Sequence, residues 1–383
     1  MFDPQRFISS RAAAIDASGI RRVFDLAAKV SDPINLSIGQ PDFDVPAKAR
    51  DAAIEAIRRG HNRYTVTQGT EKLREAIGER FDSAHKRDGR WADRGMLITS
   101  GVSGALALAL LATVGPGDKV LIGDPYFVMY KHLVRLAGAE PVFVDTYPDF
   151  RLTAERLEPH LDERTKLLLV SSPSNPTGVV LEPGEWAELV TLADDRNLLI
   201  VSDEIYDTFC YKPYPAPDGP RCPSPADLSD RVLILRGFSK TYAMTGWRLG
   251  YAVGPGPIIE QMTKLQQYTF VCAPAPFQEA AETAVDLDMG PQVERYRRRR
   301  DRVLDRLSQR YDLTRPEGAF YAFVKAPGGL SGSEFAQRAI ERNLLIIPGS
   351  VFSEKDTHFR ISYACEDQSL ERGLDLLLEL AGA

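Results

Sequence analysis

The sequence predicts an α/β protein built on a mainly parallel central sheet with helices on both faces. Six short runs rich in leucine, isoleucine and valine lack the alternation of a half-exposed strand, which indicates strands that are covered on both faces. Segments with helical spacing separate most of these runs, and strands that alternate with helices favour a parallel sheet. The 383 residues are 44% hydrophobic and 26% charged, the composition of a folded globular protein.

The predicted elements follow one another through the middle of the chain. Strands are expected at Met96–Ser100, Lys119–Gly123, Lys166–Ser171, Leu198–Ser202, Val232–Leu235 and Leu249–Val253. One helix is expected over Ala105–Val114 and another over about Pro183–Arg196, where apolar residues recur at helical spacing. The proline-rich stretch 213–225 is expected to be a surface loop. We expect these elements to form one large domain over residues 46–270.

The two ends of the chain predict a smaller α+β domain. Residues 1–45 contain an amphipathic helix, Gly19–Val30, and an extended segment, Ile34–Ile38. Residues 271–383 begin a long arginine-rich helix at Pro291–Gln309 and then mix short extended pieces with helices. We therefore expect 1–45 and 271–383 to fold together as one discontinuous domain.

Charge and composition exclude several classes of function. The 53 acidic and 47 basic residues give a net charge of −6, so the chain has no global attraction for nucleic acid or an anionic membrane. Acidic residues interrupt the arginine run Arg297–Arg300, which is predicted to be a solvated helix face. The longest apolar stretch, Ala105–Val114, is about half the length of a membrane span, and residues 1–10 lack a signal-peptide core. The four cysteines and five histidines form no metal-binding motif. These patterns predict a cytoplasmic enzyme without a metal.

Chemically unusual residues cluster where the predicted strands end, and in open α/β sheets ligands bind beyond the carboxyl ends of the strands. The segments are Gly101-Val102-Ser103-Gly104, Asp124-Pro125-Tyr126, Asn175-Pro176-Thr177-Gly178, Asp203-Glu204-Ile205-Tyr206, Gly237-Phe238-Ser239-Lys240 and Gly246-Trp247-Arg248. No P-loop occurs, and no G-x-G-x-x-G follows a strand. A lysine that can form a Schiff base, a carboxylate for a pyridinium proton and an anion site together indicate pyridoxal 5'-phosphate.

These motifs, in this order, resemble the class I/II pyridoxal-phosphate-dependent aminotransferases of fold type I, in the aspartate/aromatic aminotransferase group. The resemblance extends from Ile38–Phe43 to Phe359–Tyr363. Its most specific part is the long motif Gly237–Gly250, which surrounds a single lysine. The resemblance implies a fold-type I PLP-dependent transferase and a homodimer with shared active sites.

The resemblance gives catalytic roles to residues of these motifs. Lys240 resembles the Schiff-base lysine, which also carries a proton between the substrate and the coenzyme. Asp203 resembles the carboxylate that pairs with the pyridine nitrogen, and the opposite charge there is expected to lower its pKa strongly. Asn175 and Tyr206 resemble the donors to the phenolic oxygen of the ring. Tyr126 resembles the aromatic residue stacked on the ring face.

Further residues resemble the phosphate site of the family. Val102 and Ser103 lie where backbone N–H groups open a helix, which is an anion site. Ser239 and Arg248 match side-chain contacts of the phosphate, and a guanidinium suits its geometry. Tyr64 resembles the tyrosine that crosses a dimer interface to the phosphate of the neighbouring subunit.

The substrate side of the site is implied in the same way. Arg360 resembles the arginine that binds the α-carboxylate of the substrate, with Asn175 and the backbone N–H of Gly39 beside it. The helix Gly19–Val30 is a candidate for a moving lid.

These roles predict an aminotransferase that moves the amino group of an L-amino acid to a 2-oxo acid. The reaction is ping-pong, and the coenzyme alternates between its pyridoxal and pyridoxamine forms. A PLP-dependent β-lyase or related synthase on the same fold stays an alternative, because the bond that breaks depends on how the substrate is oriented. A non-catalytic binding module is a second alternative, which the presence of both Lys240 and Asp203 disfavours.

Overall fold

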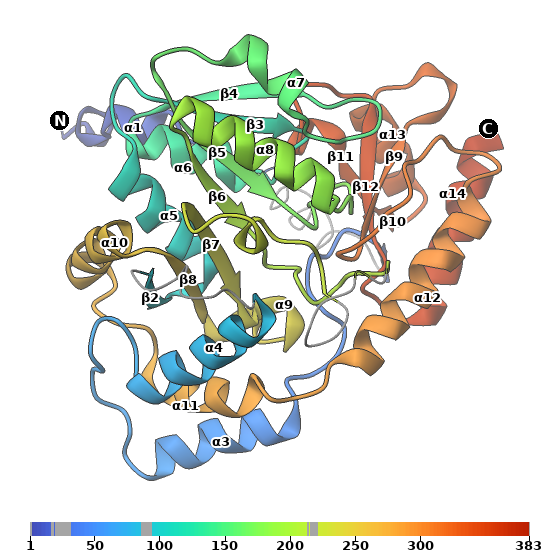
Figure 1. Ribbon diagram of the computed structural model, residues 1–383. Helices are drawn as coiled ribbons and strands as arrows, with labels where there is room; N and C mark the ends of the chain where they lie inside the picture. The colour runs from blue at the N-terminus through green and yellow to red at the C-terminus, as the bar shows by residue number, and fades with distance from the viewer. Residues whose placement is uncertain are drawn as a thin grey trace.

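A computed structural model describes residues 2–16, 19, 32–85, 94–212, 214 and 221–382. Its centre is a seven-stranded sheet with the order β2-β8-β7-β6-β5-β3-β4, which Figure 1 shows running through the middle of the molecule. The strands are β2 (Arg94–Thr99), β3 (Lys119–Asp124), β4 (Glu140–Asp145), β5 (Thr165–Ser171), β6 (Leu199–Asp203), β7 (Val232–Gly237) and β8 (Gly250–Pro255). Strand β8 is antiparallel to both of its neighbours, and the other pairs are parallel. The predicted mainly parallel α/β sheet is confirmed.

Six of these strands match the expected apolar runs, and the sequence analysis missed the seventh, β4. This strand lies at the edge of the sheet and pairs only with β3. It contains Pro141, and most of its residues are partly exposed. An edge strand tolerates proline because one side needs no ladder hydrogen bonds. Its sequence therefore lacks the continuous apolar run by which the buried strands were recognised.

Helices cover both faces of the large sheet because successive strand residues point to opposite faces. In β5, Leu167 and Leu169 pack with α5 (Gly101–Thr113), α6 (Met129–Ala137) and α10 (Gly256–Thr269). Leu168 and Val170 of the same strand pack on the other face.

That second face is covered mainly by α8 (Pro183–Arg196), which Figure 1 shows in front of the strands. The helix starts at a capping box between Glu182 and Glu185, and it ends where Asn197 adopts the left-handed conformation.

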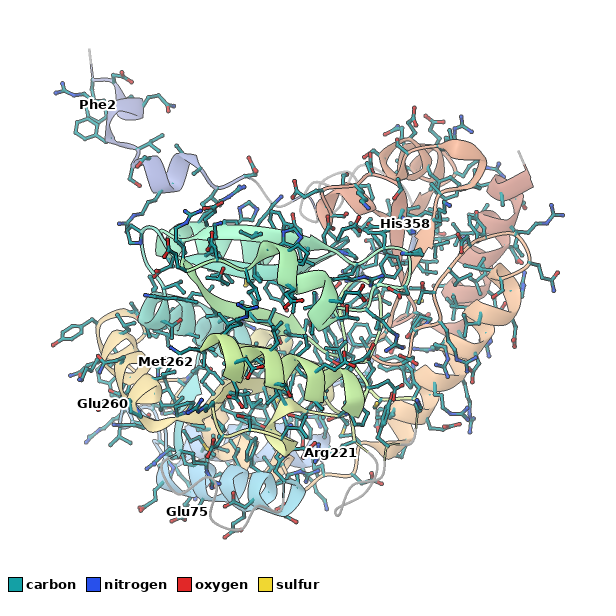
Figure 2. All side chains as sticks on the ribbon, turned by 45° about the horizontal axis from the view of Figure 1, so that its top comes forward. Phe2, Glu75, Arg221, Glu260, Met262 and His358 are labelled. Carbon is teal, nitrogen blue, oxygen red and sulfur yellow. The ribbon has the colours of Figure 1, made fainter. Side chains whose placement is uncertain are left out.

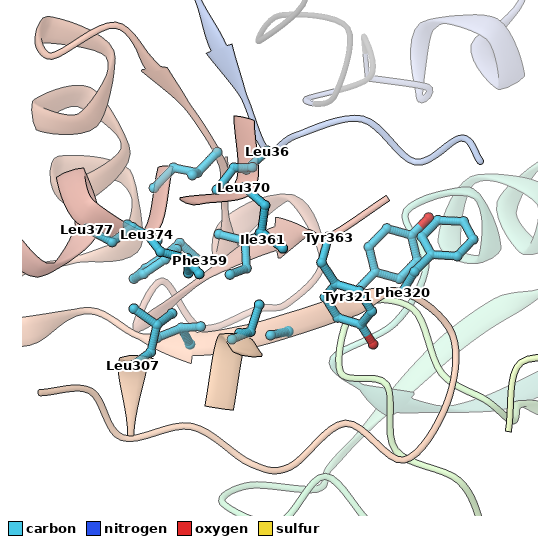
Figure 3. Packing of buried hydrophobic residues seen from close by; sticks show 14 of the residues in the cluster. Leu36, Leu307, Phe320, Tyr321, Phe359, Ile361, Tyr363, Leu370, Leu374 and Leu377 are labelled. Atoms are coloured by element: carbon cyan, nitrogen blue, oxygen red, sulfur yellow. The ribbon is translucent and has the colours of Figure 1, made fainter. Parts of the chain in front are cut away.

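The two ends of the chain share a second core. A three-stranded antiparallel sheet has the order β11-β12-β9, and a two-stranded parallel sheet joins β1 to β10. These strands are β1 (Ile34–Asn35), β9 (Tyr321–Lys325), β10 (Leu344–Leu345), β11 (Ile347–Pro348) and β12 (His358–Ser362). The helices of this part are α12 (Gly290–Leu307), α13 (Gly332–Glu341) and α14 (Asp367–Gly382). Figure 3 shows Leu36, from the N-terminal part, among residues of β12 and α14 such as Ile361 and Leu370.

The packing of α11 (Ala275–Ala284) differs from the predicted boundary at residue 271. This helix packs against α3 (Ala47–Arg58) and α4 (Glu71–Ala84), on the large-sheet side of the molecule. Small residues such as Ala281 and Ala284 allow this close approach, since both are fully buried. The second part of the chain therefore begins its own packing at α12. The division into two domains otherwise stays a prediction.

The arginine run of α12 is only partly the solvated face that the sequence predicts. Arg297 and Arg298 form ion pairs with Glu294 at the surface. Arg299 is buried between Asp42 and Asp367, and Arg300 is buried against Tyr211. Long arginine stems can cross apolar surface while the guanidinium finds partners, so charge alone did not identify the buried positions.

The remaining short helices are α1 (Ser10–Ala13), α7 (Ala154–Leu157) and α9 (Phe238–Thr241). Figure 2 shows Phe2 at the far end of an N-terminal segment that extends away from the body of the molecule. The predicted helix Gly19–Val30 lies almost entirely outside the described residues. In the part of the chain that the structure describes, no helix has the length and apolar character to cross a bilayer.

Candidate active site

A cavity of about 290 Å³ gathers most of the predicted site residues. Its lining includes Gly39, Val102, Ser103, Asn175, Asp203, Tyr206, Ser239, Lys240, Arg248 and Arg360. These residues come from segments at the ends of β5, β6 and β7, from the start of α5, from the segment before β8, from β12 and from the segment after β1. The cavity therefore lies at the carboxyl ends of the parallel strands, as expected for an open α/β sheet.

Lys240 lies on the short helix α9, directly after β7, and points into this cavity. Its Nζ donates a hydrogen bond to the backbone oxygen of Gly39, at 2.7 Å. Burial, together with the positive charges of Arg360 and Arg248, lowers the pKa of Lys240 to about 8 against the opposing effect of Asp203. A lysine with a lowered pKa is neutral more often, and only the neutral amine is a nucleophile.

Asp203 ends β6 and is buried beside the cavity. Tyr130 donates a hydrogen bond to its Oδ2 at 2.7 Å, and the N–H of Ile205 donates to its Oδ1 at 3.2 Å. Burial raises the pKa of Asp203 to about 6, although both hydrogen bonds and Lys240 lower it. The chain's own groups raise this pKa because the loss of hydration outweighs the nearby donors and Lys240. The strong lowering expected from the positive charge of the ring nitrogen stays a prediction.

Two pairs of side chains connect this end of the cavity to the C-terminal part of the chain. The hydroxyls of Tyr206 and Tyr321 lie 2.9 Å apart. Arg360 Nη1 donates to Asn175 Oδ1 at 2.9 Å, and Arg360 Nη2 donates to the backbone oxygen of Ser37 at 2.8 Å. The predicted neighbours Asn175, Tyr206 and Arg360 are thus brought together by the fold.

Arg360 is buried without a carboxylate partner among the described residues. Its guanidinium carbon lies 4.4 Å from the ring centre of Tyr321 and 4.6 Å from that of Phe352. The Nε atom is buried and has no hydrogen-bond partner in the described chain. A buried guanidinium with spare donors is suited to bind an anion bidentately.

The other end of the cavity is built for an anion by the start of α5. Ser100 gives no side-chain cap to this helix, so its first N–H groups, among them those of Val102 and Ser103, have no partner within the helix. Gly101 has a φ of +70°, and a Cβ there would lie 2.6 Å from Arg248 Nη2. The glycine therefore lets the arginine approach the helix end closely.

The structure corrects the prediction for Tyr126. Its ring stacks on Phe143 with the centres 4.6 Å apart, and its hydroxyl donates to Glu354 at 2.6 Å. Tyr126 lies outside the cavity, whereas the next residue, Phe127, lines it. The backbone N–H of Tyr126 donates to the oxygen of Phe352, so both the backbone and the hydroxyl of Tyr126 are held by residues that are far away in the sequence. Tyr64 also lies outside the cavity, with 83% of its surface exposed.

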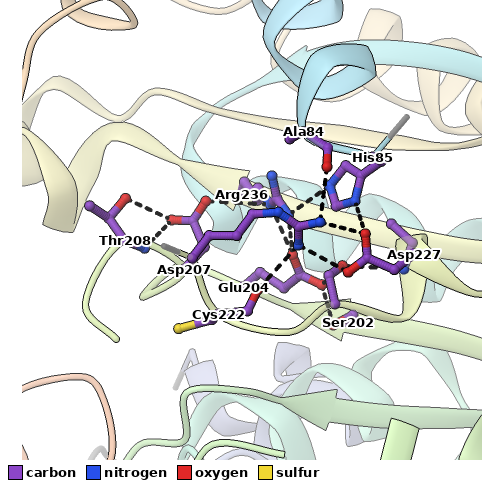
Figure 4. A network of polar contacts seen from close by, with 12 residues as sticks. Ala84, His85, Ser202, Glu204, Asp207, Thr208, Cys222, Asp227 and Arg236 are labelled. Carbon is purple, nitrogen blue, oxygen red and sulfur yellow. Dashed lines mark hydrogen bonds and ion pairs between the residues drawn. The ribbon is translucent and has the colours of Figure 1, made fainter. Parts of the chain in front are cut away.

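A buried polar network includes Glu204, the residue that follows Asp203 (Figure 4). Glu204 accepts hydrogen bonds from Ser202, Ser224 and Arg236. His85 Nδ1 lies 2.8 Å from Asp227 Oδ1, while its Nε2 lies 3.2 Å from Arg236 Nη2. Because the arginine can only donate, Nε2 accepts and Nδ1 carries the proton, so the imidazole is neutral. Ser202 and Glu204, the two residues on either side of Asp203, are thus held by buried hydrogen bonds.

Sequence reasoning missed several residues that line the cavity, notably Phe127, Tyr130 and Tyr321. Phe127 could have been considered, since it adjoins the predicted Tyr126. Tyr130 and Tyr321 stand in no recognised motif. Each acts on a predicted residue that is far away in the sequence, Asp203 and Tyr206 respectively.

The sequence also matches a known family over nearly its whole length. Residues 31–377 match the model of the family described as aminotransferase class I and II. The chain belongs to this family.

Relatives and solved structures agree with this assignment. The chain is 36% identical to a probable aspartate aminotransferase of Methanocaldococcus jannaschii, over 97% of this chain and 99% of that protein. It is also 36% identical to aromatic-amino-acid aminotransferase 2 of Thermococcus litoralis, over 96% of each chain. The structure of the aspartate aminotransferase from Rhizobium meliloti is similar with a TM-score of 0.91, at 31% identity and over 98% of both chains. This protein is thus a class I/II aminotransferase of fold type I.

Enzymes of this family depend on pyridoxal 5'-phosphate, and the residues present fit that group. The uncapped start of α5 beside Arg248 can hold a phosphate. The spare donors of Arg360 can hold a carboxylate next to it. Lys240 lines the same cavity, and the charges of both arginines lower its pKa. The cavity therefore contains groups that suit a phosphate and a carboxylate, together with an amine.

Proposed function

We propose that this aminotransferase transfers the amino group of an L-amino acid to a 2-oxo acid in a ping-pong reaction, with Lys240 as the residue that binds pyridoxal phosphate. The observation that carries the proposal is the position of the Lys240 Nζ. It lies inside the cavity, with its pKa lowered to about 8. No general structural need explains a partly buried lysine whose hydrogen-bond partner is a loop carbonyl, but a nucleophile needs this environment.

When bound, pyridoxal phosphate supplies an aldehyde and an electron-withdrawing ring that stabilises negative charge on the substrate Cα. Asp203 is proposed to hold a proton on the ring nitrogen. With a pKa of about 6 it is mostly ionised at neutral pH, and an added positive charge favours its ionised form further. Phe127 and Ile205 line the cavity as apolar surfaces for the two faces of the ring. Tyr206 and Asn175 are proposed to donate to the phenolic oxygen.

Arg360 is proposed to orient the substrate. Binding of its guanidinium fork to the α-carboxylate fixes one end of the amino acid, and Gly39 adjoins the same space. Once its hydrogen bond to Gly39 is broken, the Lys240 amine would be able to take a proton from the substrate Cα and deliver it to the coenzyme. A pKa of about 8 suits both acts, since a proton carrier works best when its pKa is near the working pH.

The site is proposed to be completed by a second copy of the chain. Tyr64 is 83% exposed on the segment that joins α3 to α4, so its phenol is free to reach a neighbour rather than the cavity of its own chain. The proposal is a homodimer in which this phenol contacts the phosphate site of the partner. Sedimentation analysis of Tyr64→Ala and wild type reports whether each protein is a dimer. Coenzyme binding by the two proteins tests the contact, and the variant should bind the coenzyme more weakly even where the dimer persists.

A single-turnover experiment tests the reaction type. The purified holoenzyme is mixed with one amino donor at a time, without any oxo acid, and the visible absorption of the coenzyme is followed. We expect one equivalent of 2-oxo acid per site, loss of the visible band, and recovery of the band when 2-oxoglutarate is added.

Two controls make the result specific. Lys240→Ala must give no turnover, whereas Lys264→Ala, which changes a surface lysine paired with Glu260, must behave as wild type. Continuous turnover without an oxo acid, with release of ammonia or thiol, would refute transamination and favour the β-lyase alternative.

A further inference from the structure

Tyr321 contacts both the phenol of Tyr206 and the guanidinium of Arg360, although no motif points to it. It begins β9 and only 1% of its surface is exposed. Its hydroxyl lies 2.9 Å from that of Tyr206, and the two rings meet edge to face at 87°. Among the described residues, the Tyr321 hydroxyl makes no other hydrogen bond than this one. The contact joins the C-terminal part of the molecule to the turn after β6.

The same side chain supports two other parts of the site. The ring of Tyr321 faces the guanidinium of Arg360 at 4.4 Å, which is a cation–π contact. A Cβ placed on Gly39 would come within 2.8 Å of the Tyr321 hydroxyl, so the segment that bears the Lys240 acceptor rests directly on this phenol. Tyr321 therefore touches the proposed carboxylate site, the proposed lysine environment and Tyr206 at once.

The direction of the tyrosine–tyrosine hydrogen bond follows from counting protons. Each phenol has one proton to donate and can accept a hydrogen bond on its oxygen. Burial raises the pKa of both phenols, so both stay protonated at neutral pH. When Tyr206 donates its only proton into the cavity, its contact with Tyr321 requires the Tyr321 hydroxyl to be the donor.

We propose that Tyr321 is a positioning residue, whose hydroxyl donates to the Tyr206 oxygen and so directs the Tyr206 proton toward the phenolic oxygen of the coenzyme. This inference rests on the proposed function. A phenol that accepts a hydrogen bond is a stronger donor, because chains of hydrogen bonds polarise one another. Tyr321 thus strengthens the stabilisation of negative charge on the coenzyme through its hydrogen bond to Tyr206.

A spectroscopic pH titration of the holoenzyme tests the proposal. The visible band of the coenzyme on Lys240 changes when the proton shared between the lysine nitrogen and the phenolic oxygen is lost. Weaker donation from Tyr206 makes that oxygen more basic, so the midpoint must rise. From a strengthening of about 10–30% of one charge-assisted hydrogen bond, Tyr321→Phe should raise the midpoint by roughly 0.1–0.6 pH unit. Tyr206→Phe should raise it by roughly 1–2 units, since the whole bond is lost.

The double variant distinguishes action through Tyr206 from any independent effect. In the Tyr206→Phe background, Tyr321→Phe should leave the midpoint unchanged. Tyr311→Phe is the matched control, because it removes a buried hydroxyl that bonds to the oxygen of Leu377 at 2.5 Å, in the C-terminal core. This control should leave the midpoint at its wild-type value.

Three outcomes overturn the inference: no shift in Tyr321→Phe, a downward shift, or the same shift with and without the Tyr206 hydroxyl. Thermal unfolding of each holoenzyme shows that the variants are folded. A wild-type protein that forms no visible band with pyridoxal phosphate would instead refute the proposed function, so the two failures are distinguishable.

Discussion

Replacing Arg360 separates binding from folding more clearly than any other change in the site. The guanidinium is buried and makes hydrogen bonds to Asn175 and Ser37, but no described carboxylate neutralises it. Burying a charge without an ionic partner costs free energy. Arg360 is therefore expected to destabilise the apoenzyme, and binding of an anion is expected to offset most of that cost.

The expected magnitudes follow from these contacts. Removing one partner of a buried, hydrogen-bonded charge pair costs about 2–5 kcal/mol, so Arg360→Met should lower kcat/KM for amino acids by about 30- to 5,000-fold. In the apoenzyme, loss of the buried charge stabilises the folded state. Asn175 and Ser37 each lose a hydrogen-bond donor, and each acceptor left without a partner destabilises the folded state by about 1–3 kcal/mol. Because these effects oppose each other, the free energy of unfolding should change by less than about 2 kcal/mol.

The assay compares an amino acid with the amine that lacks its carboxylate, using single-turnover loss of the coenzyme band. Wild type should react far faster with the amino acid, and Arg360→Met should abolish most of this preference while leaving the amine rate nearly unchanged. Urea unfolding of the two apoenzymes gives the stability comparison. The reasoning is refuted by an intact preference for the carboxylate, or by a large loss of stability with an unchanged preference.

Three other predictions concern protons. Apoenzyme should capture pyridoxal phosphate with a rate that rises with pH and is half-maximal near pH 8, the lowered pKa of Lys240, in stopped-flow mixing; a flat profile would contradict a titrating lysine. Tyr130→Phe removes a donor to Asp203 and should raise the carboxyl pKa above about 6. As the pH is lowered, the coenzyme affinity of this variant should therefore begin to fall at a higher pH than that of wild type. Burial lowers the pKa of His85 below 6.5, so the unfolded chain binds more protons than the native state, and the free energy of unfolding should fall as pH drops below about 6.5. His85→Gln should remove this part of the pH dependence in urea titrations, and identical slopes for the two proteins would count against it.

The sequence was sufficient for the parts of the site that lie in short contiguous motifs. Lys240, Asp203 and Arg248 each follow or precede a strong apolar strand, and parallel strands bring their carboxyl ends to one edge of the sheet. The fold class followed from the same runs. Arg360 differs from these residues because it does not lie at the end of a strand of the large sheet. It reaches the cavity only because β12, near the end of the chain, packs beside it.

The features that sequence reasoning missed depend on long-range packing. Phe127, rather than Tyr126, faces the cavity because Tyr126 is held by Phe352 and Glu354, and no local pattern encodes those contacts. The pKa of Asp203 depends on the balance between burial and donors, which residue identity does not reveal. Tyr321 reaches Tyr206 only after β9 has packed beside the large sheet.

The central claim, that Lys240 is the residue to which the coenzyme attaches, is tested most directly by reducing the holoenzyme with borohydride and mapping the modified peptide by mass spectrometry. The structure predicts a single phosphopyridoxyl group on Lys240, within the sequence Gly237-Phe238-Ser239-Lys240. Modification of another lysine in its place, or no stable modification in a protein that binds the coenzyme, would contradict the account.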